Sequence, residues 1–293
     1  MMPVRDGSEY IARPRGITTS AFLTISIEIE GGWVYSAASM KIFATYNIKG
    51  GVGKTAAAVN LAYLSGQSGF RTLIWDLDAQ GAASFYFRTR ARLKGGAERL
   101  LKRKRNLPKF IRHTGYDNVD LIPADFSLRN LDIDLAEKKN PDIQLIKMLR
   151  AVKHEYDVVM LDCAPTVSLA SENIIHMADW LLIPLIPTHL SLRAYQQLHK
   201  FFIKEGIDMD HLMPFFSMVD KRKKLHRGLI VEFAADHPEL LRTYIPYLSQ
   251  IEQMGVHRAP VGAFAPRGPG GRAFDSLWQA IMARTVLAPR EEQ

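Results

Sequence analysis

A glycine-rich stretch shortly after Met40 carries the residue types that bind phosphate. Its glycines can turn backbone N–H groups toward phosphate oxygens, and the helix expected after it adds a positive dipole end. Its second lysine can reach the β- and γ-phosphates, and the next hydroxyl can ligate Mg²⁺. We therefore predict an ATP and Mg²⁺ site. The predicted nucleotide contacts are Lys49, Gly50, Gly51, Val52, Gly53, Lys54, Thr55 and Ala56.

Two apolar runs end in aspartates, which supply the carboxylates that such a site needs. Asp76 and Asp78 follow the run that begins at Thr72, and Asp162 ends another apolar run. Strand ends on one side of a parallel sheet point toward the nucleotide crevice, so these side chains should meet there. An aspartate at the end of an apolar strand can hold Mg²⁺. We predict a metal site of Thr55, Asp76 and Asp162; the alternative for Asp76 and Asp78 is a capping pair at a strand–helix junction.

The elements that would position these residues alternate from Met40 onward. Short runs that are apolar on both faces are typical of a parallel sheet covered by helices. Their alternation with helical stretches predicts an α/β fold, a doubly wound and mostly parallel sheet with helices on both faces. The predicted strands are 41–46, 72–75, 119–122, 158–161, 180–184, 215–219 and 243–245. The predicted helices are 54–67, 127–138, 143–153, 171–177, 190–205, 229–237 and 272–285.

The phosphate loop departs from the strict G-x-x-x-x-G-K-[ST] pattern. Ile48 stands where that pattern has glycine, and a second lysine, Lys49, comes directly after it. In these residues the chain resembles the deviant Walker A ATPases of the ParA/MinD family. The resemblance implies that Lys49 reaches phosphate bound by the other subunit of a dimer and that Asp78 orients the attacking water. It gives Lys49, Lys54 and Asp78 as catalytic residues; the alternative for Lys49 is a solvated loop lysine.

The resemblance extends from Met40 to about Leu287. Its later matches are short and include Ile245-Pro246, where adenine contacts usually lie in the family, so Pro246 is the expected adenine neighbour. Departures are Ala79, where the family has proline, Ala56, where a second threonine is common, and Tyr247, where many DNA-binding members have arginine. Ala79 predicts a looser turn after Asp78, and Tyr247 weakens a direct transfer of the family's DNA site to this chain.

The family resemblance implies a ParA-like positioning ATPase. ATP would close a homodimer that binds DNA nonspecifically, and a ParB-like or cargo-adaptor protein would stimulate slow hydrolysis. Such a protein would be cytoplasmic and nucleoid-associated. The chain's charge of +8 is concentrated between Arg88 and Arg112, which suggests phosphate contact or an acidic partner, with a solvated mobile loop as the alternative. The DNA candidates are Lys221, Arg222, Lys223, Lys224, Arg227, Arg258, Arg267 and Arg272.

Two other function classes fit the sequence less well. A MinD-like membrane switch needs a terminal basic amphipathic helix, and the chain ends in a proline-interrupted, acidic stretch. A reductase ATPase needs bridging cysteines, and the chain has one, Cys163, which is more typical of a small buried side chain. A CobQ-like amidotransferase needs an added Cys/His domain for which no residues remain.

The composition and the first residues limit the remaining possibilities. No apolar run approaches the ~18 residues of a membrane span, and the nine histidines show no metal-type pairing, so we expect no structural transition metal. Residues 1–39 differ in pattern from the rest of the chain, and we expect an N-terminal extension outside the fold, with Met40 as the start of the protein. The alternative is a genuine short arm. Residues 40–293 would then form a single ParA-like ATPase domain.

Overall fold

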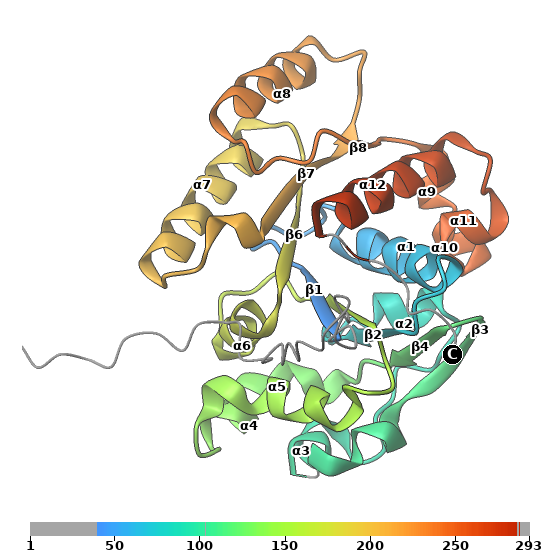
Figure 1. Cartoon of the computed structure of the whole chain (residues 1–293), viewed down its shortest axis with the longest axis vertical. Coiled ribbons are helices and arrows are strands. Elements are labelled where there is room, and N and C mark those ends of the chain that lie inside the picture. The colour runs from blue at the N-terminus through green and yellow to red at the C-terminus, as the bar shows by residue number, and fades with distance from the viewer. Residues whose placement is uncertain (1–39, 103, 286, 288–293) are drawn as a thin grey trace, which may run out of the picture. The chain divides into compact units, whose positions relative to one another are not determined.

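The computed structural model describes residues 40–102, 104–285 and 287, all of which belong to one unit, Ala37–Gln293 (Figure 1). The expectation that residues 1–39 are an extension lies outside the described residues and remains a prediction. Met40 itself is buried against the core.

An eight-stranded sheet in the order β3-β4-β2-β5-β1-β6-β7-β8 organises this unit. All neighbouring strands are parallel except β3 and β4, which pair antiparallel at one edge. The predicted doubly wound α/β fold is therefore confirmed. The strands are β1 (Lys41–Thr45), β2 (Thr72–Asp76), β3 (Arg112–Tyr116), β4 (Val119–Ile122), β5 (Val158–Asp162), β6 (Trp180–Leu185), β7 (Leu212–Val219) and β8 (Tyr244–Pro246).

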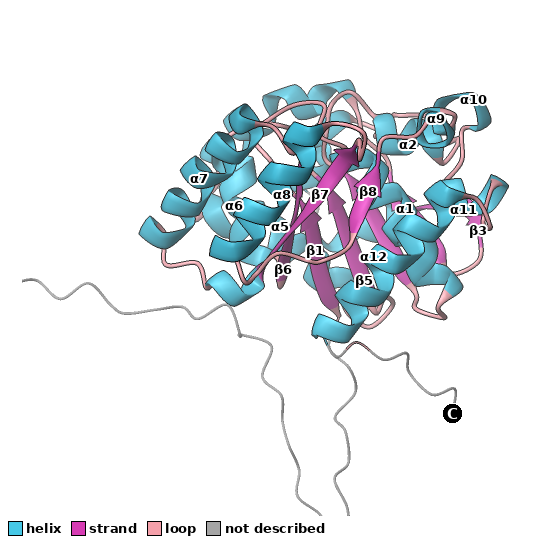
Figure 2. Cartoon of the chain, turned by 90° about the horizontal axis from the view of Figure 1, so that it is seen from above, coloured by secondary structure: helices cyan, strands magenta, loops and turns pink. Residues whose placement is uncertain are grey.

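Helices cover both faces of the sheet (Figure 2). They are α1 (Lys54–Gln67), α2 (Ala82–Tyr86), α3 (Gly96–Lys102), α4 (Leu131–Ala136), α5 (Gln144–Leu149), α6 (Leu169–Met177), α7 (His189–Lys204), α8 (Lys224–Asp236), α9 (Ser249–Glu252), α10 (Met254–His257), α11 (Val261–Phe264) and α12 (Pro269–Thr285). Short 3₁₀ turns are η1 (Lys104–Phe110), η2 (Phe126–Asn130), η3 (Pro141–Ile143), η4 (Arg150–Val152) and η5 (Met209–His211).

Alternating side chains of the central strands build two separate cores. On β1, Ile42 and Ala44 pack with residues of α3 to α8, whereas Phe43 packs with residues of α1 and α12. On β5, Val159 and Val158 divide between the same two cores. Because successive side chains of a strand point to opposite faces, a strand apolar throughout must be buried on both. This explains why β1, β2 and β5 carry consecutive apolar residues on both faces before their polar ends.

The structure differs from the predicted elements at the sheet edge and around α8. Strand β3 was not predicted, because its Arg-His-Thr-Gly-Tyr sequence is mostly exposed and lacks an apolar period. Helix α8 begins five residues before the predicted 229, because its first turn is mostly exposed and lacks an apolar period, with only His226 buried there. The described part of the basic stretch from Arg88 to Arg112 contains α3, η1 and the first residue of β3, and apolar residues within it, including Leu100 and Phe110, pack into the core. This described part is therefore not a solvated mobile loop.

Two strand registers position the expected site. Thr45 at the end of β1 and Asp76 at the end of β2 both lie opposite Asp162, the last residue of β5 between them. The phosphate loop, which comes after β1, and both aspartates therefore meet at the carboxyl edge of the sheet. Within the described ranges, no helix is both long and apolar enough to cross a membrane.

Candidate nucleotide-binding site

The phosphate loop turns into α1 through a glycine in a left-handed conformation. Gly53 is the residue before α1 and has φ 95°. A Cβ atom at this position would lie 2.8 Å from Ser217 Oγ, so both the backbone and its neighbour favour glycine. At Gly50 and Gly51 an added Cβ would meet nothing within 4 Å, which leaves the outer side of the loop open to a ligand.

Lys54 lies folded into this loop. Its side chain is buried, and Nζ donates a hydrogen bond to the Lys49 carbonyl oxygen at 3.1 Å. Burial lowers the pKa of Lys54, and the nearby carboxylate of Asp162 opposes that shift. The amine therefore lies in the loop, within the field of the strand-end aspartates.

Asn47 holds the loop to the sheet, and sequence reasoning missed it. This fully buried side chain donates from Nδ2 to the Pro184 carbonyl of β6 at 2.9 Å, and its Oδ1 accepts the Lys49 N–H at 2.9 Å. The first bond joins the end of β1 to the neighbouring strand β6, and the second holds the start of the phosphate loop to Asn47. The only signal in the sequence is a polar residue directly after an apolar strand. Lys49 is partly buried, and its Nζ has no hydrogen-bond or ion-pair partner among the described residues.

Asp162 and Asp76 are adjacent, fully buried carboxyl groups. Neither oxygen of Asp162 has a hydrogen-bond partner within the described part of the chain, nor does Oδ1 of Asp76. Burial raises the pKa of Asp162 well above its ordinary value, and the neighbouring Asp76 adds to this effect, whereas the approach of the Thr55 hydroxyl opposes it. Burial also raises the pKa of Asp76 to about 6. Unpaired buried carboxylates are unfavourable, so this arrangement calls for a cation.

The donors fit Mg²⁺, which prefers carboxylate and hydroxyl oxygens together with water. Asp162, Thr55 and the free oxygen of Asp76 are the groups that would hold it. The other oxygen of Asp76 is engaged by Ser84, whose N–H and hydroxyl both donate at 2.7 Å. Ser84 Oγ also accepts the Ala124 N–H at 2.9 Å, so it anchors Asp76 to the end of β4. Ser84 is a second positioning residue that sequence reasoning missed.

Asp78 lies beyond β2 in a closed turn. Its Oδ1 accepts the Gln80 N–H at 2.9 Å, and its carbonyl accepts the Gly81 N–H at 2.9 Å, with Gly81 at φ 67°. Asp78 is only partly buried, in contrast to Asp76 and Asp162. The turn therefore closes although Ala79 stands in place of proline.

A mostly apolar pocket lies beside the loop on the α12 side of the sheet. Gly53, Ala56, Ser217, Pro246 and Phe274 are among its lining residues. The structure therefore brings the predicted adenine neighbour Pro246 together with Ala56 and Gly53. Tyr247 is also at this pocket, and its hydroxyl donates to Glu252 at 3.0 Å.

The predicted DNA residues fall into two groups. The first surrounds the start of α8, where Arg222 pairs with Asp220 at 2.9 Å and Arg227 donates to the Lys221 carbonyl at 2.6 Å. Lys223 and Lys224 are exposed there and have no ion-pair partner in the described ranges. The second group comprises Arg258, Arg267 and Arg272 around α10 to α12.

Arg258 of the second group takes part in an internal contact. Its guanidinium lies 4.6 Å from the centre of the Phe85 ring and donates to the Phe85 carbonyl at 3.3 Å. Arg88 donates in return to the carbonyl oxygens of His257 and Arg258, at 2.9 and 3.2 Å. These two arginines therefore join the end of α2 to the end of α10. Arg272 reaches the Arg267 carbonyl.

Cys163 is the residue after Asp162 and is a free, buried thiol. Burial raises its pKa well above the ordinary value. It is a small buried side chain, as predicted from the sequence.

Comparison with known proteins points to one family. The profile of the AAA domain matches residues 40–209. The sporulation initiation inhibitor protein Soj of Bacillus subtilis is 28% identical over 249 residues, covering 83% of this chain and 98% of that protein. The chromosome-partitioning ATPase Soj of Treponema pallidum is 27% identical, with the same coverage of 83% and 98%.

A solved structure shares the fold. The putative plasmid partition protein of Borrelia burgdorferi B31, bound to AMPPNP, has a TM-score of 0.69 at 19% identity, covering 84% of this chain and 99% of that one. At this identity the likeness concerns the fold. The profile covers more than half of the chain and includes the phosphate loop, Asp78 and Asp162. The chain therefore belongs to the AAA domain family, and within it to the ParA/MinD ATPases.

Proposed function

We propose that this protein is an ATP-dependent dimerising switch that hydrolyses ATP slowly and binds DNA nonspecifically, and thereby partitions or positions a plasmid, a chromosome region or a protein cargo. One observation carries the proposal. The buried carboxyl groups of Asp76 and Asp162 lie side by side, with oxygens that have no partner in the described ranges, next to the phosphate loop that Gly53 joins to α1. Relatives named for chromosome partitioning support the cellular role.

The first task of the site is to bind and orient the triphosphate. Open space next to the Cα atoms of Gly50 and Gly51 leaves room for a phosphate, and the backbone N–H groups of the loop would donate to its oxygens. Lys54 would exchange its hydrogen bond with the Lys49 carbonyl for the β- and γ-phosphates. When bound, Mg²⁺ would neutralise phosphate charge, held by Thr55 and Asp162 with Asp76 beside them.

The second task is to position water for attack on the γ-phosphate. Asp78 suits this role because it is partly exposed and held in a closed turn. Asp76 is less suited, since Ser84 occupies one of its oxygens. Phosphoryl transfer depends mainly on charge neutralisation and in-line positioning, and one positioned carboxylate without a further cationic group gives slow turnover.

Dimer closure would supply that further cation. The unpartnered Nζ of Lys49 is available to reach phosphate in a partner subunit. Lys223 and Lys224 at the start of α8 are the exposed cations best suited to DNA phosphate. A ParB-like or cargo-adaptor protein would then stimulate hydrolysis and cause release of the DNA. A protein that acts in this way would work in the cytoplasm, at the nucleoid.

The alternative of a MinD-like membrane switch has less support. Helix α12 uses its apolar residues Phe274, Leu277, Trp278 and Ile281 in the core, so they are not available to a membrane. The residues after 287 lie outside the described part of the chain.

Nucleotide-dependent DNA binding tests the proposal. Mobility shifts of random-sequence duplex DNA should appear with ATP and not with ADP, and should weaken steeply with salt. Co-sedimentation with anionic liposomes in the same nucleotide states is the matched control. ATP-dependent liposome binding without DNA binding would favour the membrane switch and contradict the partition function.

A further inference from the structure

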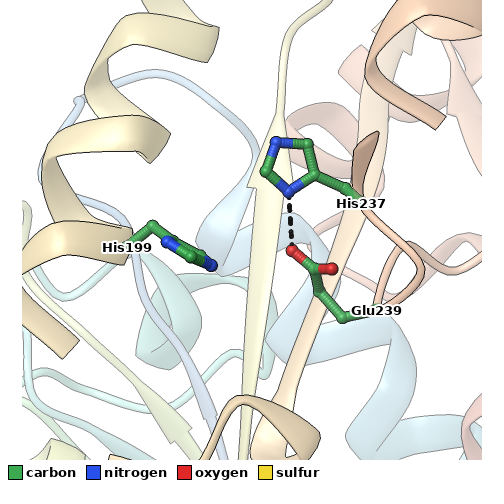
Figure 3. Close-up of side chains that lie close together, drawn as sticks. All are labelled: His199, His237 and Glu239. Carbon is green, nitrogen blue, oxygen red and sulfur yellow. Dashed lines mark hydrogen bonds and ion pairs between the residues drawn. The ribbon is translucent and has the colours of Figure 1, made fainter. Parts of the chain in front are cut away.

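A second cluster of polar side chains lies away from the nucleotide site. His199 is near the end of α7, while His237 and Glu239 lie between α8 and β8. The phosphate loop follows the carboxyl end of β1. This cluster instead precedes the amino end of β8, so it lies toward the opposite ends of the parallel strands. Figure 3 shows the His199 ring directed from α7 toward His237 and Glu239.

The three side chains are close enough to share one ion. One nitrogen or oxygen ligand atom from each lies within 4.8 Å of the other two, and all three residues are partly buried. Ligands about 2.1 Å from a tetrahedral zinc ion are about 3.4 Å apart. The widest gap must therefore close by at most about 1.4 Å, which a rotation of the partly exposed His199 side chain can provide.

Neighbouring residues hold two of the three groups in place. Glu239 Oε1 accepts hydrogen bonds from the Tyr195 hydroxyl at 2.7 Å and from His237 Nδ1 at 2.8 Å. The His237 ring stacks on Phe233 with centroids 3.9 Å apart. Tyr195 is fully buried one turn before His199 on α7, so the same helix supplies one ligand and the group that orients another.

Neither packing nor hydrogen bonding explains why the His199 ring points toward His237 and Glu239. Its ring contacts Tyr195 and His237, with centroids 5.9 Å apart in each case, but neither nitrogen has a hydrogen-bond partner in the described ranges. In the same ranges, the only side chains that donate a hydrogen bond to the Glu239 carboxylate are those of Tyr195 and His237. An imidazole without a hydrogen-bond partner in the described ranges therefore lies beside an existing histidine–carboxylate pair.

We propose that His199, His237 and Glu239 bind a transition-metal ion, most suitably Zn²⁺, with water completing the coordination. Two imidazoles and one carboxylate are a zinc-type ligand set, and Mg²⁺ favours oxygen ligands instead. In the bound state Nδ1 of His237 offers its lone pair, the ring proton resides on Nε2, and the hydrogen bond to Glu239 is replaced by metal–ligand bonds. Tyr195 remains on Glu239 as a positioning residue. The ion ties α7 to the turn between α8 and β8.

Zinc titration of the full-length, tag-free protein tests this site directly. The protein is stripped with EDTA, desalted, and titrated with Zn²⁺ against a chromophoric chelator in excess Mg²⁺ and without nucleotide. We expect one Zn²⁺ bound per chain and a higher Tm of the protein with Zn²⁺. With Co²⁺ in place of Zn²⁺, we expect the visible absorption bands of a cobalt ion with few ligands. Failure to bind Zn²⁺ stoichiometrically would overturn the proposal.

Ligand and control variants locate the ion. His199→Gln and Glu239→Gln should each weaken Zn²⁺ binding more than about 100-fold, and Tyr195→Phe should weaken it by about 10-fold. A Tm measured without metal shows which of these variants are folded. The matched controls His154→Gln and His176→Gln replace exposed histidines and should leave the affinity unchanged. Anomalous diffraction at the zinc edge from soaked wild-type crystals needs no variant. Zinc located elsewhere, or full affinity in both ligand variants, would refute the site.

Discussion

At the scale of single residues, the nucleotide site combines exposed and buried carboxyl groups with different tasks. Asp162 and Asp76 are buried with unpartnered oxygens, whereas Asp78 is partly exposed in a hydrogen-bonded turn. Burial favours the neutral carboxylic acid, so the buried pair becomes favourable in its ionised form only beside a cation. Asp78 is partly exposed and can contact water without one. Under the proposed function, the same residue type would serve metal binding and water positioning through its environment.

The role of Asp78 predicts a separation of binding from turnover. Asp78→Ala should keep ATP affinity within a few-fold, because the phosphate loop is unchanged, and lower kcat by about 100-fold or more. Equilibrium binding of a fluorescent ATP analogue and phosphate release measure the two effects. Asp236→Ala replaces an exposed carboxylate on α8 and should change neither. Turnover at the wild-type rate in Asp78→Ala would contradict the assignment.

Asp179 predicts a pH-dependent contribution to stability away from the nucleotide site. Its Oδ2 accepts the Ile42 N–H at 2.8 Å, and burial raises its pKa. Because its pKa is raised on folding, the Asp179 carboxyl group stays protonated to a higher pH in the folded state than in the unfolded state. This group therefore lowers the free energy of unfolding as pH rises through the raised pKa. Asp179→Asn can keep the hydrogen bond and should be more stable than wild type near pH 7.

Urea unfolding of both proteins between pH 4 and pH 7 measures this effect. The stability advantage of Asp179→Asn should shrink toward pH 4, because protonation of Asp179 in the folded wild type removes the buried charge. An advantage that is constant with pH would indicate a packing effect instead.

At the scale of elements, the junction between β1 and α1 determines whether the site can form. The turn needs a left-handed residue at Gly53, close to Ser217 of β7, and Asn47 links the same turn to β6. Three strands therefore converge on one loop. This explains why one substitution in the loop can affect both folding and binding.

Two glycines of this loop give a matched pair of substitutions. Gly53→Ala should destabilise the nucleotide-free protein by about 1–3 kcal/mol, because its φ is 95° and Ser217 lies 2.8 Å from the added Cβ. Gly50→Ala meets open space and should shift the nucleotide-free Tm little. Thermal unfolding without nucleotide compares them, and equal losses of stability would refute this view of the junction.

At the scale of the whole molecule, its proposed surfaces divide between a dimer contact and a DNA contact. Lys49 lies at the nucleotide site with an unpartnered Nζ, and Lys223 and Lys224 lie at the β7–α8 junction. Arg258 and Arg88 instead link α10 to α2, so their charges take part in internal contacts. Of the DNA candidates, Lys223 and Lys224 are therefore more available than Arg258.

The dimer contact predicts a nucleotide-dependent change in mass. With a nonhydrolysable ATP analogue, the wild-type protein should elute as a dimer in size-exclusion chromatography with light scattering, and Lys49→Ala should remain a monomer. Lys49→Ala should still bind the nucleotide through Lys54. A dimer of normal stability in Lys49→Ala would show that this lysine does not cross between subunits.

The DNA contact predicts a change in salt dependence. Replacing both Lys223 and Lys224 by alanine removes about two phosphate contacts per subunit, or about four per DNA-binding dimer, and should reduce the slope of log K against log salt by about 3.6. Replacing the exposed Lys139 and Lys153 instead is the control and should leave the slope unchanged. Fluorescence anisotropy with random duplex DNA and ATP measures both.

The sequence by itself determined the nucleotide chemistry and the fold class. The phosphate loop is a single local segment whose function depends on residue types at covalently determined spacing, and strands buried on both faces reveal themselves by continuous apolar runs. The strand-end positions of Asp76 and Asp162 were predictable from the same apolar runs. Strand β3 escaped prediction because an exposed edge strand needs no apolar pattern.

Only the tertiary structure decided which distant residues meet. Asn47 and Ser84 position the site through partners on other strands, and His199 joins His237 and Glu239 from another helix. The nine histidines showed no metal-type pairing in the sequence because these contacts arise from the packing of α7 against the end of α8. Spacing along the chain constrains residues within one loop, whereas residues on separate elements approach one another only as those elements pack on the sheet.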